Sequence, residues 1–232
     1  MSINARLIQI TPDQMKQFLA DSQQAYEFIL GESAKSSAQT SREMEEWKRK
    51  NAAVLLQTIA AGSKLEDLDA DARAAFDRVH KEFNEIASRT VEKAMEDFRS
   101  GKLQKKKQVG ISLEKSWHGI HFLLTGQAES GAPPLAWAIH GDTELPDLQK
   151  VMGYGPARLL TPKQVGQVHA ALAKIEQKNL SRRFDAKAMR AAKVYAVTEQ
   201  MEFSYFWAYL MVLKAYFAQA AKLKKAMLHY FE

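Results

Sequence analysis

The sequence of 232 residues contains no cysteine, and this absence excludes several classes of protein. A disulfide scaffold, a thiolate metal site and a cysteine nucleophile all require that residue. A chain without cysteine fits a reducing compartment, so we expect a cytoplasmic location. Hydrophobic residues nevertheless make up 46% of the chain, which is enough for a sizeable core and argues against global disorder.

Long apolar runs are scarce as well. Residues 1–6 lack the apolar run of a secretion signal, so none is expected. The one membrane candidate covers residues 203–221, but Lys214 and several polar residues interrupt it. A spanning helix needs about 20 largely apolar residues. The segment therefore predicts a helix of the core, and we expect no membrane association.

The signatures of common enzymes are missing too. The sequence has no phosphate-binding loop, dinucleotide fingerprint or HExxH zinc motif. No serine occupies a nucleophile elbow, and no pair of carboxylates suggests glycosidase chemistry. We therefore assign no catalytic residue, cofactor or metal from the sequence.

Local signals predict helices and strands along the rest of the chain. Thr11-Pro12 and Thr161-Pro162 each predict the start of a helix, because threonine caps a helix N-terminus and proline suits its first position. The first of these helices should end at Gly31. Further helices are expected over 112–126, in short pieces over 179–195, and over 199–223, with strands over 6–10, 135–139 and 226–231.

Residues 32–108 have a different pattern from the rest. Polar linkers at 31–41 and 99–110 flank two predicted helices, each with an apolar stripe that it cannot bury alone. We expect an inserted αα-hairpin there, on a body formed by residues 1–31 and 109–232. With strands near both termini and in the middle, the body should be α+β: a single domain with a mixed sheet and packed helices.

Two long motifs give the chain a resemblance to a known family. One is the segment KSWHGIHFLLTG at 115–126, and the other is GYGPARLLTP at 153–162. Both resemble segments of the YfbM-like family of small bacterial proteins, a domain of unknown function. The likeness covers residues 1–31 and 109–232, whereas the hairpin at 32–108 is longer than the connection typical of the family. The resemblance implies a bacterial protein with an α+β fold, but no activity, catalytic residue or cofactor.

Histidines supply the first part of a candidate site. His118 and His121 are three residues apart on a predicted helix, so both rings can lie on one face. Zinc needs a third or fourth ligand, and His140 or Asp142 would complete a set only if the fold brought them near. The alternatives are a polar ligand pocket and a purely structural role, with Trp117 and His121 in the core and His118 as a buried polar group.

The loop at 153–158 supplies the second part. Two glycines and a proline fix its backbone, and Arg158 would face a pocket and bind a carboxylate or phosphate. Alternatively, Arg158 ties down the loop through carbonyls or an internal acid, and the sequence leaves both open. The candidate pocket comprises Trp117, His118, His121, Tyr154 and Arg158.

Basic residues gather toward the C-terminal half, although the net charge of +6 is modest. The patch comprises Lys178, Arg182, Arg183, Lys187, Arg190 and Lys193. Such a patch favours an acidic partner or nucleic acid. No aromatic nucleic-acid-binding motif accompanies it, so nucleic acid is disfavoured, and a solvated basic face is the plain alternative.

We therefore expect a non-catalytic protein-binding module, a hypothesis reached partly by elimination. One concrete version is an immunity protein that neutralises a bacterial toxin, which needs a complementary surface and no chemistry. Interfaces concentrate energy in aromatic and arginine side chains, and the candidates here are Trp47, Phe76, Phe83, Phe98 and Arg183. The alternative is a small-ligand-binding protein or an enzyme that uses the histidine, tyrosine and arginine pocket.

Overall fold

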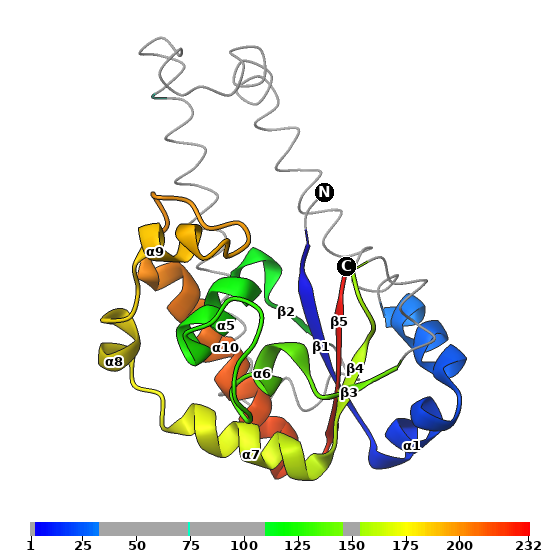
Figure 1. Ribbon diagram of the computed structural model, residues 1–232. Helices are drawn as coiled ribbons and strands as arrows, with labels where there is room; N and C mark the ends of the chain where they lie inside the picture. The colour runs from blue at the N-terminus through cyan, green and yellow to red at the C-terminus, as the bar shows by residue number, and fades with distance from the viewer. Residues whose placement is uncertain (1–2, 33–73, 75–109, 146–153) are drawn as a thin grey trace, which may run out of the picture. The chain divides into compact units, whose positions relative to one another are not determined.

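The computed structural model describes residues 3–32, 74, 110–145 and 154–232 (Figure 1). Nearly all of the predicted hairpin lies outside these residues. Four candidate partner-surface residues lie outside them too, namely Trp47, Phe76, Phe83 and Phe98. The described fold is therefore that of the body, which contains the fifth candidate, Arg183.

The chain divides into two compact units. Residues 1–28 with 95–232 form the larger unit, and residues 29–94 form the other. The predicted hairpin begins at residue 32, close to the start of the second unit at 29. It ends at residue 108, well after the end of that unit at 94. The predicted insertion itself stays a prediction.

A five-stranded sheet crosses the larger unit, with the strand order β2-β1-β5-β4-β3. Its strands are β1 (Ala5–Ile10), β2 (Ile111–Ser112), β3 (Thr143–Glu144), β4 (Arg158–Leu160) and β5 (Ala226–Phe231). β1 and β5 pair along their whole length, from Ala5 opposite Phe231 to Ile10 opposite Ala226. Segments from the two ends of the chain therefore lie side by side in the middle of the sheet.

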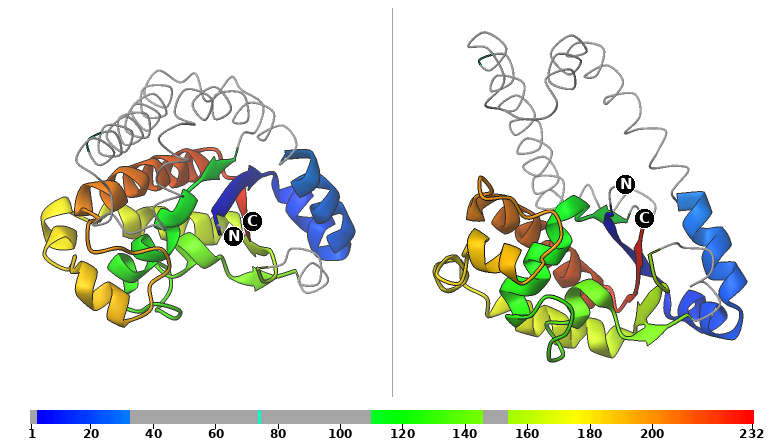
Figure 2. Two further views of the ribbon diagram at one scale, coloured as in Figure 1. Left: turned by 90° about the horizontal axis from the view of Figure 1, so that it is seen from above. Right: turned by 45° about the horizontal axis from the view of Figure 1, so that its top comes forward.

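Helices lie on both sides of this sheet. α1 (Pro12–Ala20) lies on one side, and α5, α6, α7 and α10 lie on the other (Figures 1 and 2). The helices after β2 are η2 (Glu114–Ser116), α5 (Trp117–Thr125), α6 (Trp137–His140), α7 (Pro162–Ala173), α8 (Gln177–Ser181), α9 (Ala186–Ala191) and α10 (Phe203–Lys222). Thr11 and Thr161 each form a capping box with the glutamine three residues on, which confirms both predicted helix starts.

The main core lies between the sheet and the helices of the α10 side. α10 contributes Phe206, Leu210, Leu213 and Phe217, which are at most 1% exposed. α10 is the apolar segment that the sequence predicts as a core helix. The strand that follows it, β5, has the predicted bounds of 226–231. Among the described residues, no helix is long and apolar enough to cross a membrane.

Three sequence predictions about this unit are wrong. The predicted strand over 135–139 is instead a turn followed by α6, where the N–H of Gly141 donates to the carbonyl of Trp137 and closes a helical turn. A short apolar run cannot be assigned to strand or helix by periodicity alone. The first predicted helix is interrupted at Asp21, between α1 and the helical residues 22–32.

The predicted mixed sheet is the third correction, because each described strand pair is antiparallel. A single crossover helix between two neighbouring strands makes them parallel. Between β4 and β5 the chain instead forms four helices, α7 to α10, and re-enters the sheet in the opposite direction.

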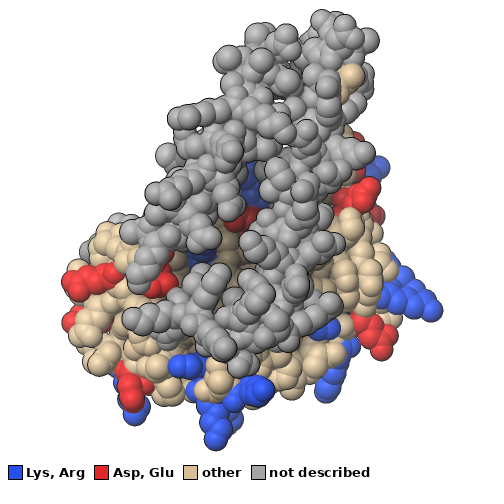
Figure 3. Space-filling model, turned by 180° about the vertical axis from the view of Figure 1, so that it is seen from behind, with Lys and Arg blue, Asp and Glu red and all other residues tan. Residues whose placement is uncertain are grey.

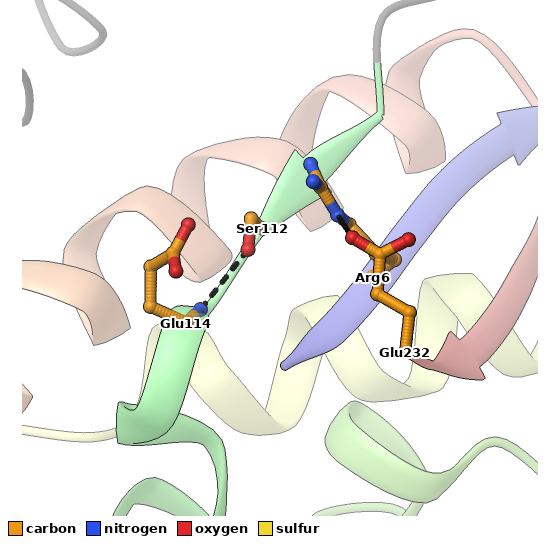
Figure 4. Close-up of polar contacts among 4 residues, drawn as sticks. All are labelled: Arg6, Ser112, Glu114 and Glu232. Atoms are coloured by element: carbon orange, nitrogen blue, oxygen red, sulfur yellow. Dashed lines mark hydrogen bonds and ion pairs between the residues drawn. The ribbon is translucent and has the colours of Figure 1, made fainter. Parts of the chain in front are cut away.

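Polar contacts fasten the ends of the body to the sheet. The Nε of Arg6 in β1 donates to Glu232 Oε1 at 2.6 Å, and Asn4 and Glu232 exchange two backbone hydrogen bonds (Figure 4). Where the chain leaves β2, the hydroxyl of Ser112 accepts the N–H of Glu114 at 3.1 Å. One end of the central strand pair β1–β5 and the exit from β2 are thus each fixed by polar contacts.

Candidate functional site

His118 is held by segments that are far apart in the sequence. Its side chain is buried, with Nε2 2.8 Å from the carbonyl oxygen of Ala128 and Nδ1 2.8 Å from the backbone nitrogen of Tyr195. A carbonyl oxygen can only accept, so Nε2 carries the hydrogen and Nδ1 accepts from Tyr195. Both nitrogens of the neutral ring are therefore used by the protein's own backbone.

Trp117 packs directly on this histidine. The two rings stack at 4.7 Å between centroids, with planes 6° apart. Phe231 of β5 and Tyr195 pack against the same indole at 4.8 and 6.0 Å. The indole N–H donates to the carbonyl of Ile3 at 3.1 Å, which ties α5 to the N-terminal segment. These are the contacts of a core residue.

With the residues that the structure describes, the His121 ring makes one of its two possible hydrogen bonds. Its Nε2 lies 2.8 Å from the carbonyl oxygen of Ser130, so this nitrogen carries the hydrogen. Its Nδ1 is then a bare acceptor, and it is buried with no hydrogen-bond partner among the described residues. The ring of His140 on α6 approaches it at 4.4 Å, with the planes at 79°.

Two further histidines complete a cluster, of which His229 is buried and His140 half-buried. His140 comes from α6, and its Nε2 is buried. His229 comes from β5, where Nδ1 donates to the carbonyl of Ile139 at 3.1 Å. Within the part of the chain that the structure describes, neither Nε2 has a hydrogen-bond partner. We call His118, His121, His140 and His229 the histidine cluster. Sequence reasoning considers His140 as a neighbour of His121 but misses His229, whose only signal is a polar residue within a buried strand.

Burial keeps the histidine cluster neutral. Desolvation lowers the pKa of both His118 and His121. It lowers the pKa of His140 to about 3, with further contributions from the charge of His121, Arg158 and the other two rings. It lowers the pKa of His229 to about 4, and Arg158 acts in the same direction. The cluster is therefore a set of neutral hydrogen-bonding rings near pH 7.

The described residues offer no ready metal site. No group of three or more histidine, aspartate or glutamate side chains in the described ranges is arranged to hold a metal ion. Asp142, the other possible ligand considered from the sequence, accepts a hydrogen bond from the Gln164 side chain at 2.6 Å. Of the two ring nitrogens of His118, neither is available to a metal.

Arg158 and Tyr154, the other two residues of the candidate pocket, are more exposed than His118 and His121. The guanidinium of Arg158 on β4 contacts the carboxylate of Glu144 on β3, with Nε 3.2 Å from Oε1. Glu144 is therefore an internal acid of the kind that the sequence analysis considers for Arg158, and the ion pair joins the neighbouring strands β3 and β4. Tyr154 is 37% exposed and precedes Gly155, whose φ of 98° is left-handed. Trp117, His118 and His121 thus form one buried group, while Arg158 and Tyr154 lie nearer the surface.

Arg183 lies away from the histidine cluster. It follows α8 in a turn, where its N–H donates to the carbonyl of Leu180 at 3.0 Å. The side chain is exposed.

Comparisons with known proteins support the family and the fold. A family model described as "Domain of unknown function (DUF1877)" matches residues 1–230, so the match extends across the predicted hairpin as well. The chain is similar to the crystal structure of YfbM from Escherichia coli, a protein of unknown function, with a TM-score of 0.53 and 13% identity over 99% of each chain. At this identity the likeness concerns the fold alone. No curated protein matches the chain.

Proposed function

The chain belongs to the DUF1877 family, and we propose that it is a non-catalytic protein-binding module. The observation that carries this proposal is the way in which the candidate pocket uses its polar groups. Both nitrogens of His118, one nitrogen of His121 and the guanidinium of Arg158 bind groups of the same chain. A catalytic acid or base must be within hydrogen-bond reach of a substrate atom, and these groups are already engaged within the fold.

A binding protein needs exposed anchors instead, and the described surface offers some. Arg183 is exposed and, among the residues that the structure describes, has no ion-pair partner. Arginine is a frequent interface anchor, because its planar fork donates two parallel hydrogen bonds to a carboxylate. Leu19 and Leu223 add apolar side chains that are 50% and 46% exposed.

An immunity protein is the specific form of this proposal that we would test first. The full chain would serve as bait in cells of its native source, and captured proteins would be identified by mass spectrometry. A captured toxin whose activity falls when the purified chain is added would support this form. A captured partner of another class would limit the proposal to protein binding.

Two single substitutions test whether partner binding depends on the exposed surface and folding stability on the candidate pocket. Arg183→Ala should weaken partner binding by more than about 1 kcal/mol without changing the free energy of unfolding. His118→Ala should lower that free energy by about 1–3 kcal/mol, because Ala128 and Tyr195 lose a buried partner, and should leave the affinity of the folded protein unchanged. Affinity would be measured by calorimetry and unfolding by urea titration. The opposite result would favour a function of the candidate pocket. It consists of unchanged partner binding in Arg183→Ala together with loss of ligand binding or catalysis in Arg158→Ala.

A small-ligand-binding function is the second candidate, and the unpartnered nitrogens of the histidine cluster favour it. His121 Nδ1, His140 Nε2 and His229 Nε2 are buried and have no hydrogen-bond partner in the described ranges. A ligand with hydrogen-bonding groups would satisfy them. A thermal-shift screen of polar metabolites tests this function: a compound that stabilises the wild type but not His121→Phe would support it.

A further inference from the structure

Residues 174–193 carry most of the net charge of the chain. They contain seven basic and two acidic side chains, a net charge of +5 in a chain whose total is +6. The basic residues, all exposed, are Lys174, Lys178, Arg182, Arg183, Lys187, Arg190 and Lys193. They lie on α8, on α9 and on the turns beside them, at one edge of the larger unit (Figures 1 and 2). We call this surface the basic platform.

Buried apolar side chains hold the basic platform in place. Leu180 of α8 and Met189 of α9 are 2% and 0% exposed. Between the two helices, Phe184 packs against Phe203 and Phe206 of α10, with centroids 6.1 and 5.8 Å apart. The cations therefore project from an ordered backbone, and a partner need not supply the free energy to order it.

Few acidic groups neutralise these cations. The carboxylates of Asp185 and Glu176 accept hydrogen bonds from a backbone N–H and a side-chain amide nearby. Of the seven basic residues, Arg190 alone forms an ion pair in the described part of the chain, with Glu199. Figure 3 shows that both basic and acidic side chains lie along the rim of the face that is seen from behind. The basic platform thus presents an excess of positive charge that a complementary surface would neutralise.

The surroundings of the cations favour an acidic protein over other anionic partners. Single-stranded nucleic acid is bound by exposed aromatic side chains as well as cations, but the platform's one aromatic ring, Phe184, is half-buried against α10. A membrane-binding surface needs exposed apolar side chains, and none of the exposed large hydrophobic residues in the described ranges lies within 174–193. The guanidinium forks of Arg182 and Arg183 bind carboxylates and phosphates alike through paired hydrogen bonds, so they fit an acidic protein once the missing aromatic and apolar groups count against nucleic acid and membranes.

We propose that the basic platform is the docking surface for an acidic segment of a protein partner. This inference rests on the proposed protein-binding function and specifies the chemistry of the partner. The cations of α8 and α9 give the encounter its electrostatic steering, and the arginines bind carboxylates at close range.

Charge reversal at the platform tests this inference with the full chain. The probe is a fluorescently labelled peptide of alternating glutamate and glycine, titrated by fluorescence anisotropy. The variant Arg182→Glu with Arg183→Glu should bind it about tenfold more weakly than the wild type. The control Lys163→Glu with Lys222→Glu makes the same change in net charge at exposed positions of α7 and α10, and should stay within about twofold. Unchanged thermal unfolding of both variants would show that they remain folded.

Three outcomes would overturn the inference. The first is an equal loss of peptide affinity in both double variants, which would show that the net charge of the chain, and not the basic platform, determines binding. The second is tighter binding of a single-stranded oligonucleotide, or of vesicles rich in anionic lipid, than of the peptide. The third is a captured native partner that binds the Arg182→Glu, Arg183→Glu variant as tightly as the wild type. That last result would contradict the docking surface but not the proposed protein-binding function. The proposed function itself would be contradicted by an enzymatic activity that is lost in Arg158→Ala.

Discussion

Lowering the pH from about 7 to about 5 should destabilise the larger unit, because its histidine cluster is neutral when folded. The unfolded chain takes up a proton on each histidine below the ordinary pKa of 6.5, whereas burial lowers the pKa of all four folded rings. The unfolded state then binds more protons, so the free energy of unfolding must fall as the pH falls. Protonation in the folded state is further disfavoured by Arg158, which is a fixed positive charge near His140 and His229.

The magnitude follows from the two rings with the largest shifts. With folded pKa values of about 3 for His140 and about 4 for His229, each ring lowers the free energy of unfolding by about 2 kcal/mol at about pH 5. The two together amount to about 4 kcal/mol, and His118 and His121 add to the effect in the same direction. Since proteins are typically stable by about 5–15 kcal/mol, this loss is a large part of the total.

Urea unfolding followed by tryptophan fluorescence at a series of pH values measures this effect. His140→Phe removes one titrating ring and should reduce the slope of the free energy of unfolding against pH by about 1.4 kcal/mol per pH unit below about pH 6. Phe231→Leu is the matched control, because it loosens the packing on His140 without removing a titrating group. A slope that is the same in the wild type and in His140→Phe, or a stability that does not change between about pH 7 and pH 5, would refute the reasoning.

Two further predictions concern local structure, and both are measured as free energies of unfolding in urea. Gly141→Ala should lower the free energy of unfolding by about 2 kcal/mol or more, because the φ of Gly141 is 70° and an added Cβ would lie 2.9 Å from the Cβ of Arg158. Gly166 lies in an open position within α7, so Gly166→Ala should raise that free energy by about 1 kcal/mol. Thr161→Ala should cost about 1 kcal/mol through loss of the capping box, and Thr161→Ser should restore most of it. Equal effects of the two glycine variants, or a failure of serine to rescue, would contradict these accounts.

Much of the fold follows from local sequence signals. The helix starts at Thr11 and Thr161 are set by capping chemistry within four residues, so the sequence alone predicts them. β5 at 226–231 is likewise predicted with its observed bounds. The two-residue strands β2 and β3 are not predicted, because they exist only through pairing with β1 and β4. Such short strands have no periodicity of their own.

The candidate site is less predictable than the fold. The spacing of His118 and His121 places both rings on α5, as expected, but their partners are carbonyls in the loop after the helix. His229 reaches Ile139 across 90 positions of sequence, and no local signal indicates such a contact. The pairing of Arg158 with Glu144 depends on the register of β3 and β4, which the sequence does not specify.

The two histidines of α5 illustrate how a motif with the spacing of a metal site can serve the fold. Rings three residues apart on a helix lie one turn apart on the same face. The carbonyls of Ala128 and Ser130, two residues apart in the following loop, are spaced to accept one hydrogen from each ring. An apolar residue at either position would remove the donor to one of these partly buried carbonyls, which costs about 1 kcal/mol. Histidine is therefore favoured at both positions as a neutral donor, so the fold explains the spacing of the pair, whereas it does not explain His121 Nδ1, which has no hydrogen-bond partner in the described part of the chain.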